Sequence, residues 1–243
     1  MTAQPQLQLD AVLRPVRGHH AFEVCVEQLA TAIRLGVYPL GTSLPPEREL
    51  AERLSVSRAT LREAMAALRE AGLVETTRGR GGGTVVTLKP SGPSARKAAR
   101  TSREQRQDWL DALAFRRIVE PGAAYQAADK SLTQTQLAQL RAAHDAVAGA
   151  RNKARHRQAD SRFHLTIATL SGSVRTLDAV TSVQASLHEM LMAIPVLGTN
   201  ISHSDVQHRE LTAAITRRRP ERARKVMEEH CDDTAALLRG LLG

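Results

Sequence analysis

Four side chains in the second half of the sequence have the types and spacing of metal ligands. Asp160 and His164 are four residues apart, so a helix would project both from one face. His208 and His230 lie on two helical stretches joined near residues 217–220, and each is eleven residues from position 219. Antiparallel helices would therefore bring both imidazoles to the same level. Three imidazoles and a carboxylate suit Zn²⁺, Ni²⁺ or a similar divalent ion. Because the chain holds nine histidines, four unrelated polar residues are the alternative.

Basic residues at the start of a predicted helix, residues 58–72, have the chemistry to contact DNA. Arg58 and Arg62 lie one turn apart where the helix dipole is positive and disfavours cations. We expect an external anion, a DNA phosphate or a guanine edge, to offset them. Arg48 is similarly placed on the preceding helix, and Ser57 and Thr60 at the helix start join the candidate DNA contacts. A solvated surface position is the alternative for each arginine.

Three short helices and a hairpin are expected to position these arginines. Apolar spacing predicts a first helix over residues 20–36, two prolines open a second over 45–54, and Ser57 caps the third. The second and third would form a helix-turn-helix whose third helix reads DNA. The runs LVETT and TVVTL flank RGRGGG, which predicts a hairpin with Arg78 in a flexible tip. No GK[ST] follows, so the glycines do not indicate a nucleotide-binding loop.

The composition predicts a mostly α-helical protein of two domains. The 243 residues are 42% hydrophobic and 2% aromatic, enough for two cores with few strands. We predict a winged helix-turn-helix over residues 1–90, a basic linker over 91–107 and an antiparallel helical bundle over 108–243. The linker is either a solvated tether or a further contact to DNA phosphates.

Charge and cysteine usage narrow the class of protein. The formal charge of +9 favours a polyanionic partner: DNA, RNA or an anionic membrane surface. The two cysteines form no disulfide framework and no CxxC motif. No apolar run reaches the roughly 20 residues of a membrane span, and the start of the chain lacks the pattern of a signal peptide. We therefore expect a soluble, cytoplasmic protein without a membrane partner.

The first half of the chain resembles a known family. The stretch PPERELAERLSVSRATLREAMAALREAGLV, followed by RGRGGGTVV, is similar to the GntR family of bacterial regulators over residues 20–88. The resemblance implies a winged helix that contacts operator DNA through Arg48, Arg58, Arg62 and a wing tip around Arg78 and Gly79. Three consecutive glycines make this tip longer than the family's common one.

The second half resembles the FCD sensing domain of the FadR subfamily. The fragments RRIVEPGAAYQAA, DSRFH, QHRELTAAI and EEHCDD carry this resemblance. In metal-binding members an aspartate and three histidines hold a divalent ion below a pocket for a small organic acid, which implies these roles for Asp160, His164, His208 and His230. Arg116 matches an arginine that often faces the effector pocket. A structural pair with Glu120 is the alternative for Arg116.

Taken together, the residues and the resemblance predict a regulator rather than an enzyme. We expect a homodimeric repressor on a palindromic double-stranded operator, controlled by an acid bound at the metal ion. One alternative is a metal-dependent hydrolase tethered to DNA, with Glu189 as a general base. Another is a basic architectural protein without sequence preference. Five further side chains match no ligand position: His144, His156, His188, His203 and Cys231.

Overall fold

The computed structural model describes residues 13, 15–16, 21–34, 37–77, 83–87, 103–150, 152–195 and 197–242. By their contacts the residues fall into two compact units. The first comprises residues 1–103 with 191–200 and 233–243, and the second comprises 104–190 with 201–232. The prediction of a mostly helical protein with one small hairpin is confirmed.

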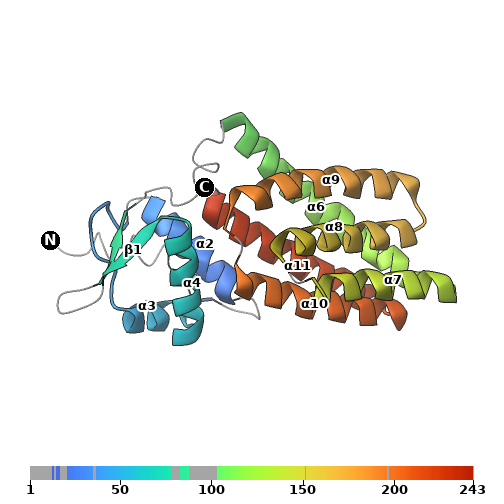
Figure 1. Ribbon diagram of the computed structural model, residues 1–243, viewed down its shortest axis with the longest axis horizontal. Helices are drawn as coiled ribbons and strands as arrows, with labels where there is room; N and C mark the ends of the chain where they lie inside the picture. Colours follow the sequence, from blue (N-terminus) through green and yellow to red (C-terminus); the bar gives the residue numbers. More distant parts are fainter. Residues whose placement is uncertain are drawn as a thin grey trace. The chain divides into compact units, whose positions relative to one another are not determined.

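Three helices form the core of the winged helix-turn-helix in the first unit (Figure 1). They are α2 (Ala21–Arg34), α3 (Glu47–Leu54) and α4 (Arg58–Glu70). Helix α4 packs against both α2 and α3. The apolar stripes expected from the sequence are buried: Phe22, Val26, Leu29, Ala30 and Ile33 in α2; Leu50, Ala51 and Leu54 in α3; and Leu61, Ala64, Met65 and Leu68 in α4.

Local hydrogen bonds fix where α3 ends and α4 begins. Ser55 adopts a left-handed conformation, φ 55°, and its N–H donates to carbonyls of the last turn of α3. Ser57 is extended and its Oγ accepts from the Thr60 N–H at 3.0 Å, so the predicted N-cap is confirmed. Gly72 follows α4 with φ +74°, a conformation that glycine adopts without strain.

The predicted hairpin follows α4. Strands β1 (Val74–Thr77) and β2 (Gly83–Val86) pair antiparallel, from Val74 opposite Val86 to Thr77 opposite Gly83. The segment before α3 adds backbone bonds to the other edge of β2, including Leu44 N–H to the Thr84 carbonyl. The sheet therefore holds the end of α4 and the start of α3 in one compact group.

Six long helices form the bundle, drawn from green to red in Figure 1. Their bounds are α6 (Arg103–Asp129), α7 (Gln134–Ala148), α8 (Lys153–Leu170), α9 (Val174–Ala193), α10 (Gly198–Thr216) and α11 (Pro220–Leu242). Helix α6 begins at Arg103, inside the segment predicted as linker. Apolar residues of α6, α7, α8, α10 and α11 share one core, which includes Leu140, Phe163, Ile167, Leu211 and Met227.

A three-residue turn joins α10 to α11. Arg218 lies in this turn with φ 52°, and the Arg219 N–H donates to the Ala214 carbonyl. The turn is short, so the two helices are neighbours that run in opposite directions. Within the described residues, no helix combines the length and apolarity of a membrane span.

Candidate metal centre and nucleic-acid interface

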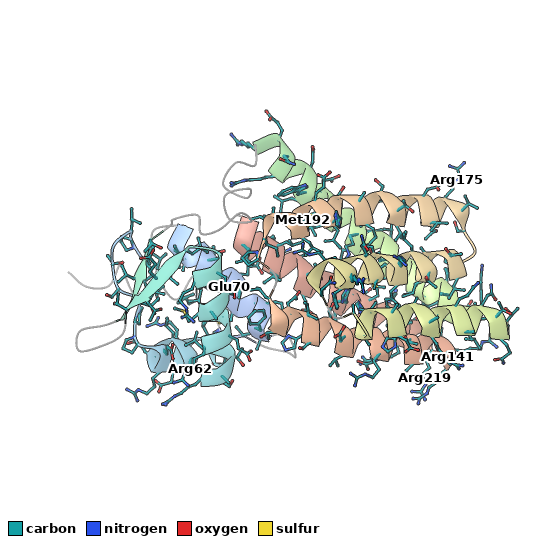
Figure 2. The ribbon with its side chains drawn as sticks, in the orientation of Figure 1. Arg62, Glu70, Arg141, Arg175, Met192 and Arg219 are labelled. Atoms are coloured by element: carbon teal, nitrogen blue, oxygen red, sulfur yellow. The ribbon has the colours of Figure 1, made fainter. Side chains whose placement is uncertain are left out.

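The predicted DNA-contacting arginines of α3 and α4 are exposed. Arg48 pairs with Glu52 of its own helix at 3.6 Å, and the Arg62 Nε donates to Glu47 Oε2 at 3.0 Å. Arg58 is exposed and has no ion pair to any described residue. Figure 2 shows Arg62 at the edge of its unit, where its side chain is 71% exposed. The expectation that only an external anion offsets these arginines is therefore corrected for Arg62, because Glu47 supplies an internal carboxylate.

The remaining predicted DNA contacts divide into two groups. The Ser57 and Thr60 hydroxyls lie 2.8 Å apart at the exposed start of α4, so each is already held in place by the cap. Arg78 and Gly79 lie outside the described residues. The described part of the candidate DNA interface is thus the start of α4 with the exposed side of α3.

Three of the predicted metal ligands meet in the interior of the bundle. One ligand atom each from His164, His208 and His230 lies within 4.8 Å of the others. Their rings are close together, with centroids 5.0 Å apart for His164 and His230 and 4.9 Å apart for His208 and His230. They come from α8, α10 and α11, and all three residues are buried. Asp160 approaches this group through His208, with Oδ1 3.4 Å from Nε2.

Neighbouring acceptors orient two of the three imidazoles. His164 Nδ1 lies 2.8 Å from Glu120 Oε2, and His230 Nδ1 lies 2.9 Å from the Gln207 amide oxygen. A carboxylate and an amide oxygen only accept hydrogen bonds, so each Nδ1 is placed as a donor to its neighbour. Acceptors behind imidazoles are the usual second layer of metal sites, where they fix the tautomer and raise ligand basicity.

His208 is held in the neutral form that a metal ligand requires. Burial lowers its pKa to about 3, although Asp160 opposes this shift. Neither ring nitrogen of His208 has a hydrogen-bond partner within the described part of the chain, and the same holds for His164 Nε2. Buried nitrogens without partners are costly, so the residues present fit a bound cation.

A buried ion pair adjoins the histidines. Arg116 Nε lies 3.3 Å from Glu120 Oε1, and each side chain is at most 2% exposed. Burial alone would raise the pKa of Glu120, but Arg116 and His164 hold it far below its usual range. The Nη1 and Nη2 atoms of Arg116 are buried without a hydrogen-bond partner in the described structure. Arg116 is thus a partner of Glu120 and also has donors without a partner. It therefore has features of both roles considered from the sequence, the structural pair and the effector contact.

Sequence reasoning missed three members of this network. Gln184 donates to Glu120 Oε1 at 2.7 Å, Gln207 holds His230, and the Cys231 Sγ lies 3.9 Å from Glu120 Oε2. The available signal was a polar residue in an apolar helical stripe: Gln184 lies in the stripe of Val180, Val183 and Leu187, all buried. Cys231 matches no ligand position in the sequence. Burial raises the pKa of its thiol, so it is a neutral neighbour of the carboxylate.

Comparison with known families gives two matches that together cover most of the chain. The model described as bacterial regulatory proteins, gntR family, matches residues 23–86. The model described as FCD domain matches residues 111–233. The first match contains the exposed arginines of α3 and α4, and the second contains all four predicted metal ligands and Arg116.

Similar proteins extend these matches over nearly the whole chain. An HTH-type transcriptional regulator of Mycobacterium gastri, RmpR, is 33% identical over 86% of this chain and 76% of its own length. The Glc operon transcriptional activator of Escherichia coli is 28% identical over 86% of this chain and 85% of its own. The HTH-type transcriptional repressor NanR of Cronobacter sakazakii is 27% identical over 94% and 89%. One of these relatives is named as an activator and another as a repressor.

Proposed function

Because the chain belongs to the GntR family of bacterial transcriptional regulators and carries an FCD domain, we propose that a small organic acid, bound beside a divalent metal ion in the bundle, controls its affinity for an operator. Like its relatives, the protein is a transcriptional regulator and not an enzyme. This removes the tethered-hydrolase alternative. Glu189, the base which that alternative needed, is exposed on α9.

The metal part of the proposal rests on the three buried histidines and on the nitrogens of His164 and His208 that have no hydrogen-bond partner among the described residues. His164, His208 and His230 would hold the ion, with Asp160 as the fourth ligand after a small movement toward the group. Nitrogen and oxygen donors of this kind suit Zn²⁺, Ni²⁺ or a similar ion. Such an ion supplies a Lewis-acidic position for a carboxylate oxygen.

The effector part rests on Arg116. A buried guanidinium with two unpaired Nη groups presents the paired donors that a carboxylate accepts. Glu120 Oε1 lies beside Nε of this guanidinium. An anionic ligand would therefore satisfy donors that the protein itself leaves open. The single observation that carries the proposal is this buried arginine beside three buried histidines, where Arg116, His164 and His208 have nitrogens without a hydrogen-bond partner among the described residues.

We further propose that two copies associate through the exposed side of α6. Leu110, Phe115 and Ile118 are 46%, 43% and 71% exposed on this helix, and Val174 of α9 is 75% exposed. Ile118 also lines a groove of about 680 Å³ between α6, α9 and α11. Exposed large apolar side chains on one helix favour an interface there. A two-fold dimer would present two reading helices to a palindromic operator.

The first experiment measures metal content. Elemental analysis of protein purified without chelators should give about one Zn or Ni per wild-type chain and much less in His208→Ala. His188→Ala is the matched control, because His188 is exposed on α9 and outside the cluster. A full complement of metal in His208→Ala contradicts the proposed site.

The second experiment measures control of DNA binding. A duplex selected from a random pool should bind metal-loaded protein at least roughly 10³-fold tighter than random duplex, and an acid from a broad panel should weaken that binding. We propose repression as the result of operator binding, to be read from a reporter gene behind the operator. Equal affinity for selected and random duplex would favour the architectural alternative.

The third experiment tests the dimer by sedimentation. Ile118→Asp should shift the wild-type dimer to monomer, whereas Leu40→Asp, at an exposed apolar residue of the first unit, should not. A wild-type monomer at micromolar concentration contradicts this part of the proposal.

A further inference from the structure

A second pair of a histidine and an aspartate joins α8 to α10. Nε2 of His156, on α8, lies 3.4 Å from Oδ1 of Asp205, on α10. The pair repeats the contact between Asp160 and His208, whose Oδ1 and Nε2 are also 3.4 Å apart and belong to the same two helices. The residue types are exchanged, because α8 supplies the histidine of one pair and the aspartate of the other. We call His156 and Asp205 the outer pair, and Asp160 and His208 the inner pair.

The two pairs lie in neighbouring layers of one helix interface. His156 precedes Asp160 by four residues and Asp205 precedes His208 by three, so on each helix the two side chains share a face. The layers are therefore about 5 Å apart along the helix axes. Electrostatics agrees with this spacing: burial is the main cause of the lowered pKa of His208, and the nearby imidazole of His156 adds to it.

Exposure to solvent falls from the outer pair to the inner pair. The side chains of Asp205 and His156 are 31% and 11% exposed. Asp160 is 15% exposed, and His208 only 1%. The other two histidines of the cluster, His164 and His230, are buried as well. A path along the two helices thus leads from partly exposed ligands to buried ones.

The outer pair has the chemistry to bind the same ion as the cluster. An imidazole nitrogen and a carboxylate oxygen are donors that Zn²⁺ and Ni²⁺ accept. A charge is costly to move into a protein interior without partners, so an ion that reaches the cluster needs ligands on its way. The outer pair offers two such ligands where water still has access, one turn before Asp160.

We propose that His156 and Asp205 are a capture site, which binds a divalent ion from solution and passes it to Asp160 and His208. Asp160 is the natural receiver, because it is the only one of the four proposed ligands of the cluster that is partly exposed. Two ligands hold the ion weakly enough to release it inward, where four ligands hold it. The inference rests on the proposed function, since it requires the metal ion in the cluster.

The test measures how fast the full-length protein takes up Zn²⁺. Chelator-treated protein is mixed with Zn²⁺ by stopped flow, and a fluorescent zinc indicator reports the free ion. Asp205→Asn keeps the shape of this partly exposed side chain but removes the anionic ligand. It should slow uptake about tenfold, equivalent to about 1.4 kcal/mol of capture free energy. Because the inner ligands are unchanged, release into excess chelator should slow by the same factor, and the affinity should stay that of the wild type.

A double variant separates capture from packing between the helices. His156→Asp combined with Asp205→His exchanges the residue types, as the inner pair already does, and it keeps both ligands. Its uptake rate should return toward that of the wild type. His144→Ala is the control, because His144 also lies beside an aspartate, with Nδ1 3.3 Å from Asp145 Oδ1, but this partner is its neighbour on α7. The control should change neither rate.

The outcomes distinguish this inference from the proposed function. Uptake by Asp205→Asn at the wild-type rate overturns the capture site and leaves the metal centre standing. Faster uptake and release would make the outer pair a latch over the centre, which also overturns the proposal. A changed affinity with unchanged uptake would give the pair a structural role only. If the wild type binds no Zn²⁺, the metal centre and the capture site fail together.

Discussion

The two units use the same pair of residue types, arginine and glutamate, under opposite conditions. In the winged helix, Arg62 and Glu47 meet at 3.0 Å while 71% and 42% of their side chains remain exposed. In the bundle, Arg116 and Glu120 meet at 3.3 Å and are almost completely buried. Water screens the first pair, so another anion can replace Glu47 beside Arg62 at little cost. The second pair is held by the cost of leaving either charge alone in the interior.

The difference shows that burial decides what an ion pair can do. An exposed pair near the start of a helix keeps an arginine in place until a stronger anion arrives. A buried pair holds a guanidinium whose Nη1 and Nη2 have no hydrogen-bond partner in the described structure. Both arrangements present arginine donors to an anion, but only the buried one can do so with high selectivity, since water does not compete there.

The largest expected effect comes from removing one side of the buried pair. Glu120→Ala leaves Arg116 uncompensated in the interior and should lower the free energy of unfolding by about 3–5 kcal/mol. Glu47→Ala, the matched change in the exposed pair, should cost less than about 1 kcal/mol. Urea unfolding of the metal-free proteins, followed by circular dichroism, measures both, and equal losses would erase the comparison.

The next effect is a pH dependence that belongs to the bundle alone. The pKa of His208 is about 3 in the folded protein and about 6.5 when the chain is unfolded. Its contribution is therefore fully present above pH 6.5 and falls by about 1.4 kcal/mol per pH unit as the pH drops toward 3, because only the unfolded state binds the proton. The lowered pKa of Glu120 also makes the folded protein less stable as the pH falls, but only once the pH drops below the ordinary pKa of a glutamate side chain.

Chelator-treated protein unfolded in urea at several pH values between 7 and 5 measures this slope. His208→Gln should flatten it, whereas His188→Gln, at an exposed position, should leave it intact. A slope unchanged in His208→Gln would assign the titration to another group.

A smaller effect is expected at the exposed interface. Arg58→Ala should weaken binding to the selected duplex by about 1–3 kcal/mol and relax the preference for one base pair, if Arg58 reads a base edge. Arg141→Ala removes the same charge from the exposed surface of α7 and serves as control. Fluorescence anisotropy measures both, and equal losses would reduce Arg58 to a general contribution of charge.

The smallest effect is expected from Glu47, the carboxylate that pairs with Arg62. Glu47→Gln removes the carboxylate that occupies Arg62, so binding to random duplex should tighten by a few-fold, below about 1 kcal/mol. The slope of log affinity against log salt should steepen by up to about one unit as one more phosphate is neutralised. Glu104→Gln, at the exposed start of α6, should change neither quantity. Weaker binding in Glu47→Gln would mean that Glu47 itself contacts the DNA.

The sequence predicted those features that depend on local spacing. The Ser57 cap joins residues three apart, so residue type and position were enough to place it. His208 and His230 were expected at one level because both are equally far from the turn, and their rings lie 4.9 Å apart. The winged helix could be predicted equally well, because its helices are short and their apolar stripes are clear.

The contacts between distant helices could not be predicted in this way. Gln184 and Glu120 are 64 positions apart, and their meeting depends on how far α9 is rotated about its own axis against α6. Helical periodicity shows that both side chains face inward, but it does not name the residue opposite. The pairing of Glu47 with Arg62 has the same origin, because it depends on the angle between α3 and α4.

The short turn between α10 and α11 has a consequence for how this protein can change during evolution. It fixes the register in which His208 and His230 face each other, and each residue added to a helix rotates everything beyond it by about 100°. Exchanges of one amino acid for another between the two histidines can be neutral, but a single insertion or deletion in α11 ahead of His230 would turn that imidazole away from its partners. Surface loops usually tolerate changes of length. In α11, we therefore expect the number of residues ahead of His230 to be conserved more strongly than their identity.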